Sequence, residues 1–546
     1  MHLLKLKLSP KAFVVTVLLL AGFLFATAMS NIFGKVIITP SDRRKPNFAG
    51  SWYEADARKL RPQLSDYLNH AAEASKAKSC DSSFSGNLPP GSAIFAGIAP
   101  HAGYMFSGPT AGYVYEALQH RKINRVFLLG PSHYVALHGC ALPVEKSFGT
   151  PLGDLAVDTK VVSELKDLPL FKLAPEIHNQ EHSLEMQLPF IKQAMGSVSI
   201  VPIIVGTLRD EEEMRLIGQI LKRYLTDGDI VLVSSDFTHY GPRYDYTPFE
   251  HDVPKQLKEL DETAFQKLSM CDLKRFIDFR DKTLDTICGY YPCTVLLSML
   301  PPGCHATLLR YQTSRDVLQN ADENSVSYMA IVFSNDSQKP VWKADSDGAS
   351  TVLSETDKQA LLKLARETLV DHVNKQKIPD AASTVEEHPV LGLPGGAFVT
   401  LYKKNSGISV KSEHKELRGC IGYIWPIKSL AQAVIDNAVG AASRDPRFQP
   451  VSSYEIDGLE IDINVLTSPH PVGGYKDIVV GRDGVIMYKD GKQSVFLPSV
   501  ATEFGWTLEE MLSQLSLKAG CGADGWQNGA RFDVFQSTSF SELENH

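Results

Sequence analysis

Short apolar runs alternate with amphipathic segments over roughly the first 335 residues of the chain. Between the apolar runs, polar and apolar residues follow the period of an α-helix. Runs of this length between amphipathic helices predict an α/β domain over residues 42–335, with a sheet covered on both faces. The expected strands lie at 93–99, 125–130, 199–206, 229–235, 305–312 and 328–334, and the expected helices at 110–119, 157–166, 183–195, 211–226, 253–269 and 291–300.

The pattern changes after residue 335. Residues 336–352 are mostly polar and contain Pro, Gly and Ser, which predicts a linker. Ser354 and Asp357 then have the spacing of a capping box, ahead of a stripe of apolar residues with helical period. Strands expected at 397–403, 459–466 and 484–488, and helices expected near 428–440 and 507–518, predict a separate α+β domain over residues 353–546.

The beginning of the chain is unusually apolar. Residues 12–34 carry no charge, and as a helix these 23 residues, at about 1.5 Å each, would cross a bilayer core of about 30 Å. Residues 1–41 are therefore expected to form a hydrophobic helix that anchors the protein in a membrane by a single pass. The alternative is an exported protein with a cleaved signal peptide, since Ala26-Thr27-Ala28 fits the pattern of a cleavage site. Basic residues on both sides leave the orientation open.

Composition narrows the classes of function. The net charge is −8 over 546 residues and there is no long basic patch, which argues against nucleic acid as a partner. The eight cysteines are sparse for this length and form no CxxC pair, so they are not a disulfide framework.

Side chains that can bind metals follow several of the expected strands. His101 follows the strand at 93–99, His133 follows the one at 125–130, and Asp236 and His239 follow the one at 229–235. Ligands of open α/β sheets bind beyond the carboxyl ends of the strands, where these residues should meet. Cys288 stands before the helix at 291–300, and imidazole with thiolate suits iron, copper or zinc better than magnesium or calcium.

Each of these residues also has a purely structural interpretation. A single histidine after a strand is more often a hydrogen-bonding residue than a ligand, and Cys288 alone could be a small packed thiol. The joint pattern favours a shared site, but spacing does not select the ligands. In the stretch IHNQEHSLEMQLPF, which also holds His178, a helix would place His182 and Glu185 on one face, where the carboxylate could orient the imidazole or move a proton. Glu185 could equally be a residue of the helix start.

Five motifs in order resemble the Memo-like family, also called AmmeMemoRadiSam system protein B: APHAGYMFSGPTAGYVY, LLGPSHY, EHSLEMQLPF, SSDFTHYG and ICGYYPCTVLL. The resemblance covers residues 42–335. It implies the fold of class III extradiol, LigB-type non-haem iron dioxygenases, with a metal held by His101, His133 and Cys288. It also implies that His182 and His239 line the pocket and move protons, with Asp236 beside His239.

The implied ligands favour some metals over others. A cysteine in place of the usual carboxylate makes the site softer, which favours iron, or alternatively copper, over zinc. The expected function is that of a non-haem metal-binding redox protein with dioxygenase-like chemistry, acting on an unknown small molecule or peptide. Since relatives have also been viewed as peptide-binding proteins without enzymatic activity, a non-catalytic scaffold that uses the same cleft is the alternative.

The C-terminal region resembles the AMMECR-type domain, AmmeMemoRadiSam system protein A, through KELRGCIGYIWP and AASRDPRFQP. Cys420 could be a nucleophile whose pKa is lowered by Arg418, or a small buried thiol at a tight turn. Arg444, Asp445 and Arg447 could clamp a carboxylate or phosphate, or form a salt-bridged corner. A chain that resembles both proteins implies a shared task and, by association, the radical SAM protein of that system as a partner.

Overall fold

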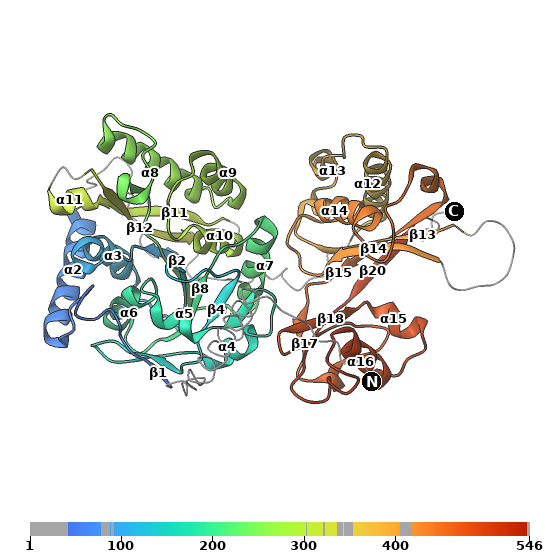
Figure 1. Ribbon diagram of the computed structural model, residues 1–546, viewed down its shortest axis with the longest axis horizontal. Coiled ribbons are helices and arrows are strands. Elements are labelled where there is room, and N and C mark those ends of the chain that lie inside the picture. The colour runs from blue at the N-terminus through green and yellow to red at the C-terminus, as the bar shows by residue number, and fades with distance from the viewer. Residues whose placement is uncertain are drawn as a thin grey trace, which may run out of the picture. The chain divides into compact units, whose positions relative to one another are not determined.

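The computed structural model describes most of the chain beyond residue 41 (Figure 1). All described residues except Asp42 belong to one compact unit, Arg43–His546. The predicted N-terminal anchor, residues 1–41, lies outside the described residues, as does most of the predicted linker. No helix among the described residues is long and apolar enough to span a membrane. The described residues are 42–77, 88, 92–301, 303–319, 323–335, 342, 353–404 and 416–542.

A nine-stranded mixed sheet forms the centre of the α/β domain (Figure 1). The strand order is β10-β12-β2-β9-β3-β8-β4-β7, and β11 pairs with β12. These strands are β2 (Ala93–Ala99), β3 (Arg125–Pro131), β4 (Cys140–Leu142), β7 (Phe171–Leu173), β8 (Ser199–Val205), β9 (Asp229–Ser234), β10 (His239–Tyr240), β11 (His305–Thr313) and β12 (Ser325–Asn335).

Four neighbouring strands of this sheet, β2, β9, β3 and β8, run parallel. The register aligns Ala99 with Ser234 and Leu129 with Val233, so the carboxyl ends of β2, β9 and β3 lie at one edge. The chain leaves each of these strands toward the same region. The common edge expected from the sequence is present, and it positions the candidate site.

Both faces of the parallel strands are covered. Every residue of β2 and of β9 is buried, and successive side chains of a strand point to opposite faces. Helix α3 (Tyr104–Leu118) contacts β2 and β12, and α10 (Tyr290–Met299) contacts β3 and β9. The apolar runs of the sequence are therefore continuous because neither face meets water.

Several helices differ from the expectation. The helix expected at 183–195 begins as a 3-10 turn, η1 (Glu185–Gln187), and continues as α6 (Leu188–Met195), so His182 precedes it. Pro189 at the start of α6 has no N–H to donate, which suits a first helical turn. Two long helices were not expected, α2 (Ala57–Ala77) and α9 (Leu273–Thr283). In contrast, α8 (Val253–Ser269) has the predicted bounds.

The α+β domain contains two four-stranded sheets. In the first, β14-β13-β15-β20, the strands pack against α14, and α12 begins with the predicted capping box of Ser354 and Asp357. The second sheet is β16-β19-β17-β18, and part of its buried side chains, including Val485 and Met487 of β17, form a separate core with those of the helices that follow β18. The bounds are β13 (Gly396–Lys403), β14 (Glu416–Tyr423), β15 (Leu459–Leu466), β16 (His470–Pro471), β17 (Gly484–Lys489), β18 (Lys492–Phe496), β19 (Arg531–Phe535), β20 (Ser537–Ser541), α12 (Glu355–Val373), α14 (Leu430–Ser443), α15 (Pro498–Glu503) and α16 (Leu508–Lys518).

One described residue of the predicted linker is anchored rather than free. The Trp342 side chain is fully buried, and its indole N–H donates to the carbonyl oxygen of Asp229 at 2.9 Å. Its ring also packs edge-on against Phe95 at a centroid distance of 5.2 Å. The chain after β12 therefore returns to the sheet of the α/β domain at this point.

Candidate metal centre

Two imidazoles and one thiol converge at the common strand edge. His101 follows β2, His133 follows β3, and Cys288 stands just before α10. The Sγ of Cys288 lies 3.2 Å from Nε2 of His101, and the rings of His101 and His133 have centroids 5.1 Å apart. One ligand atom from each of the three residues lies within 4.8 Å of the other two. This is the spacing of side chains that can share a single ion.

The His101 ring is held in one tautomer by the end of β9. The hydroxyl of Ser234 donates its only hydrogen to the carbonyl oxygen of Ser183 at 2.6 Å. Its contact of 3.0 Å with His101 Nδ1 therefore requires the imidazole to donate. Nδ1 carries the proton, and Nε2, which faces Cys288, keeps a free lone pair.

Glu181 fixes His133 in the same way. Its carboxylate accepts from His133 Nδ1 at 2.8 Å and from the His133 backbone N–H at 2.6 Å. The pKa of Glu181 is lowered to about 2, and although burial opposes this shift, hydrogen bonds to His133 and the charge of its ring outweigh it. Nε2 of His133 is again the nitrogen left for a metal. The sequence reasoning missed Glu181, although its position directly before His182 in EHSLE was a signal that could have found it.

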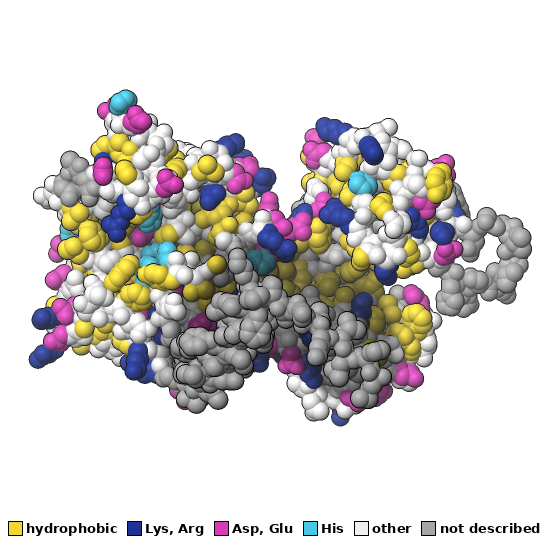
Figure 2. All heavy atoms as spheres, in the orientation of Figure 1, with side chains coloured by type: hydrophobic (Ala, Val, Ile, Leu, Met, Phe, Trp, Pro, Cys, Tyr) yellow, Lys and Arg dark blue, Asp and Glu magenta, His cyan; other side chains and the backbone are white. Residues whose placement is uncertain are grey.

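The other expected pocket residues surround these three. The His182 ring stacks on His133 at a centroid distance of 4.5 Å, and its Nδ1 lies 3.1 Å from the hydroxyl of Tyr134. His239 donates from Nδ1 to the carbonyl oxygen of Phe237 at 2.9 Å and is close enough for its charge to lower the pKa of His101. Figure 2 shows histidine side chains gathered within an apolar part of this domain's surface.

Asp236 links the loop that carries His101 to the loop that carries Cys288. Its Oδ1 accepts from the backbone N–H of His101 at 2.7 Å, and its own N–H donates to Cys288 Sγ at 3.2 Å. Burial raises the pKa of this carboxyl group to about 7. Through these two contacts Asp236 links His101 to Cys288.

Burial governs protonation at the site. It lowers the pKa of His182 and of His239 to about 4, so both rings are neutral near pH 7. It lowers the pKa of His101 well below the ordinary value, an effect that the neighbouring imidazoles reinforce. It also raises the pKa of Cys288, with a further contribution from the charge of Asp236. Near pH 7 and without a metal, the rings of His101, His182 and His239 are therefore neutral and the Cys288 thiol is protonated.

Glu185 does not face the metal-binding atoms. Its buried carboxylate accepts from Arg44 at 2.6 Å, from the Phe48 N–H at 2.7 Å and from the Tyr53 hydroxyl at 2.9 Å. It anchors the segment that carries Trp52, whose ring packs on His182 at 4.3 Å. His178 is also buried away from the cluster, where its Nε2 lies 3.0 Å from the carbonyl oxygen of Ala141.

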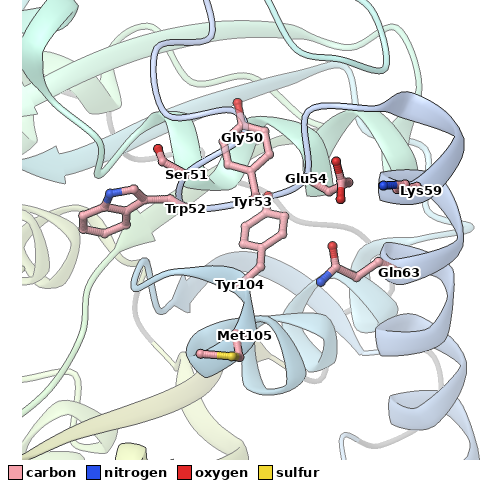
Figure 3. Close-up of a pocket in the computed structure, with 9 residues that line it drawn as sticks. All are labelled: Gly50, Ser51, Trp52, Tyr53, Glu54, Lys59, Gln63, Tyr104 and Met105. Atoms are coloured by element: carbon pink, nitrogen blue, oxygen red, sulfur yellow. The ribbon is translucent and has the colours of Figure 1, made fainter.

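The 50–54 segment, which carries Trp52, also lines a pocket of about 450 Å³ (Figure 3). It lies between the 50–54 segment, α2 and the start of α3, and Trp52 lines it as well as packing on His182. The lining combines aromatic rings with Glu54 and Lys59, so it offers both apolar and charged contacts.

The candidate residues of the α+β domain form two separate ion pairs. Arg418 pairs with Glu455 at 2.9 Å, so the structure does not direct its guanidinium to Cys420. Asp445 accepts from the Cys420 backbone N–H at 2.9 Å and pairs with Arg447 at 2.6 Å.

Of the two alternatives for Cys420, the environment of its thiol argues against the activated nucleophile. Burial raises its pKa instead of lowering it. The Thr400 hydroxyl lies 3.3 Å from Sγ. Arg444 ends α14 as its C-cap residue and is not part of the Asp445–Arg447 pair.

Comparison with known proteins divides the chain into two parts. The model of the Memo-like protein family matches residues 44–332, and the AMMECR1 model matches residues 362–540. The memo-1 homolog of Caenorhabditis elegans is 34% identical over 304 residues, which are 53% of this chain and 82% of that protein. Protein MEMO1 of Homo sapiens is 32% identical over 302 residues, 53% of this chain and 96% of that protein. Among solved structures, an uncharacterized protein of Pyrococcus horikoshii is 34% identical, with 35% of this chain and 93% of that chain covered and a TM-score of 0.32.

Proposed function

The chain belongs to the Memo-like family, and from that premise we propose that its α/β domain is a non-haem metal-binding redox protein with dioxygenase-like chemistry. One observation carries the proposal. The hydrogen bonds of His101 and His133 both place the proton on Nδ1, which leaves two Nε2 lone pairs beside the thiol of Cys288. Histidines that bind metals usually donate their other ring N–H to an oxygen in this way.

The donor set favours iron, with copper as the alternative and zinc as a less suitable ion. Soft thiolate and imidazole ligands suit all three, but a thiolate that donates electron density favours a redox-active metal. Bound here, iron would supply redox chemistry at the coordination positions that the protein leaves open.

The remaining side chains are suited to hold a substrate and move a proton. His182 is neutral at pH 7 and can accept a proton at an unprotonated ring nitrogen. Its ring is packed between Trp52 and His133, which fixes its direction. Trp52 is also one of the residues that line the pocket at the 50–54 segment. His239 is a second neutral imidazole at the site.

A non-catalytic role as a scaffold or peptide-binding protein is the second candidate. The pocket that favours it is lined by Trp52, Tyr53 and Tyr104 together with Glu54 and Lys59. Aromatic rings beside charges of both signs suit a peptide as well as a small molecule. In this case the cleft would keep its imidazole and thiol side chains but would catalyse no reaction.

Three further features of the proposal concern the rest of the chain. The AMMECR1 domain would act as an accessory to the metal-binding domain, and a radical SAM protein of an AmmeMemoRadiSam-type system would be the partner. The apolar segment within residues 1–41 would anchor the protein in a membrane.

The test is metal content of the protein purified without oxygen and loaded with ferrous iron. We expect about one iron per chain in the wild type and loss of binding in both His133→Ala and Cys288→Ser. Two matched controls come from the same domain. His138→Ala removes a half-exposed histidine that pairs with Glu213, and Cys304→Ser removes a thiol outside the cluster.

The outcomes separate the candidates. Iron lost only in the two cluster variants, with oxygen uptake when an aromatic substrate is added, supports the redox protein. A folded wild type that binds no metal supports the scaffold. Preference for zinc, with turnover that does not require oxygen, would replace the redox proposal with a hydrolase.

A further inference from the structure

Two buried carboxyl groups lie behind the candidate metal centre, and the proposed chemistry does not use them. Asp261 comes from α8, and Asp285 from the segment between α9 and α10 that leads to Cys288. Both side chains are buried, as is Thr238, which lies between them and directly precedes His239. Oδ1 of Asp285 is buried without a hydrogen-bond partner.

Counting hydrogens fixes the direction of the contacts. The Thr238 hydroxyl lies 2.6 Å from Asp261 Oδ1 and 3.2 Å from Asp285 Oδ2. It carries one hydrogen, which the shorter contact assigns to Asp261. The contact with Asp285 is then a hydrogen bond only if the carboxyl group of Asp285 supplies the hydrogen. Asp261 also accepts from the Tyr311 hydroxyl at 2.9 Å, as an ionised carboxylate would.

No cation neutralises the pair by direct contact among the described residues. Arg280 is the basic group that acts on Asp285, and its guanidinium lies over the Tyr290 ring, 5.5 Å from the centroid. The other titratable groups that face the pair are the neutral phenols of Tyr246 and Tyr311. Burial raises the pKa of Asp285 to about 7, helped by the charge of Asp261, and burial raises the pKa of Asp261 to about 6.

We propose that Asp261 and Asp285 hold one proton between them through the Thr238 hydroxyl, and that this shared proton joins the two loops that present the candidate site. The order is Asp285 to Thr238 to Asp261, with Tyr311 donating from the other side. Loss of the proton would leave two negative charges across one hydroxyl, which is unfavourable in a buried place.

The joined loops carry site residues on both sides. Thr238 continues into His239, and Asp285 continues through Thr286 into Cys288. Thr286 fastens the same loops a second time, because its hydroxyl accepts from the His239 N–H at 2.8 Å and donates to the His239 carbonyl oxygen at 3.0 Å. Asp261 and Asp285 are thus positioning residues for His239 and Cys288. This positioning role rests on the proposed function, whereas the shared proton does not.

The shared proton can be observed directly, in the full chain without metal. We expect the infrared spectrum of the wild type at pH 6 to contain more C=O absorption from protonated carboxyl groups than that of Asp285→Asn, and we expect this difference to fade as the pH rises through about 7. Asp236 titrates in the same range, so its band should remain in Asp285→Asn. Should Asp285→Asn not fold, Asp236→Asn removes the overlapping band instead, and the band that remains belongs to the pair.

The positioning role has its own test, which compares the iron affinity of two substitutions at Asp285. Asp285→Ala removes the donor to Thr238 and should weaken iron binding about tenfold. Asp285→Asn offers an amide N–H to Thr238 and should bind iron as the wild type does. Asp261→Asn should bind iron more weakly, because its single amide oxygen cannot accept from both the Thr238 and the Tyr311 hydroxyls as the two carboxylate oxygens do. Absence of a pH 6 band once the contribution of Asp236 is subtracted would overturn the shared proton. Equal iron affinity in Asp285→Ala and Asp285→Asn, with the band present, would overturn the positioning role alone. Absence of iron binding in every form, with the band present, would contradict only the proposed function.

Discussion

Cys288 is the residue whose protonation controls metal binding. Burial raises the pKa of its thiol, so the metal-free protein holds it protonated at neutral pH. The metal binds the thiolate, and each ion bound must therefore displace one proton. The affinity for iron should rise about tenfold for each unit of pH over the range in which the free thiol remains protonated. Calorimetry in buffers of different ionisation enthalpy would measure the released proton, and affinity that does not change with pH would contradict this.

The sequence predicted the types of the site residues better than their roles. His101, His133 and Cys288 come together as the family resemblance implied. Glu185 was expected beside His182 on one helix face, but the helix begins later and the carboxylate binds Arg44. No local pattern shows that Arg44, 141 residues away, takes this partner. Glu181 was missed because its partner His133 is distant in sequence.

The ion pair of Glu185 and Arg44 stabilises the segment that carries Trp52. Both side chains are almost completely buried, so Glu185→Gln leaves a buried guanidinium without its counter-charge. We expect a loss of about 3–5 kcal/mol in the free energy of unfolding. Asp154→Asn is a matched control, because it breaks the exposed pair with the neighbouring Arg43 and should cost at most about 1 kcal/mol. Urea unfolding of both variants measures the difference, and similar losses would contradict this assignment.

At the scale of elements, the first turn of α10 must pass very close to the end of β9. A Cβ atom at Gly289 would lie 2.3 Å from the side chain of Ser235 and 3.0 Å from the Ser234 carbonyl oxygen. Gly289→Ala should therefore displace Cys288 and weaken iron binding about tenfold or more. At Gly103 a Cβ would meet nothing nearer than 3.5 Å, so Gly103→Ala should bind iron normally. Iron titration with circular dichroism as a check on folding compares the two, and normal binding by Gly289→Ala would contradict the proposed ligand.

Apolar periodicity identified the central strands because burial on both faces makes them continuous apolar runs, as in β2 and β9. It also gave the bounds of α8 and β15. It missed α2, whose composition is strongly polar on average and which contains Pro62. Short strands such as β4 and β16 contain too few residues to form a pattern. The division of the α+β domain into two sheets depends on pairings between distant segments, which periodicity does not contain.

At the scale of the whole molecule, all three proposed ligands belong to the Memo-like domain. The AMMECR1 domain contributes none of them, and its Cys420 is a partly buried thiol of raised pKa. Cys420→Ser should therefore bind iron with wild-type stoichiometry and affinity. Anaerobic equilibrium binding checks this, and loss of iron in this variant would mean that the metal site includes the AMMECR1 domain.

The central claim is that one ion is held by His101, His133 and Cys288. A crystal structure of the anaerobic, iron-loaded protein, with diffraction recorded on both sides of the iron absorption edge, tests it most directly. The account predicts one anomalous peak per chain, at about 2.0–2.3 Å from Nε2 of His101, Nε2 of His133 and Sγ of Cys288. An iron peak bound by other residues, or no peak in a protein whose three side chains are ordered, would contradict it.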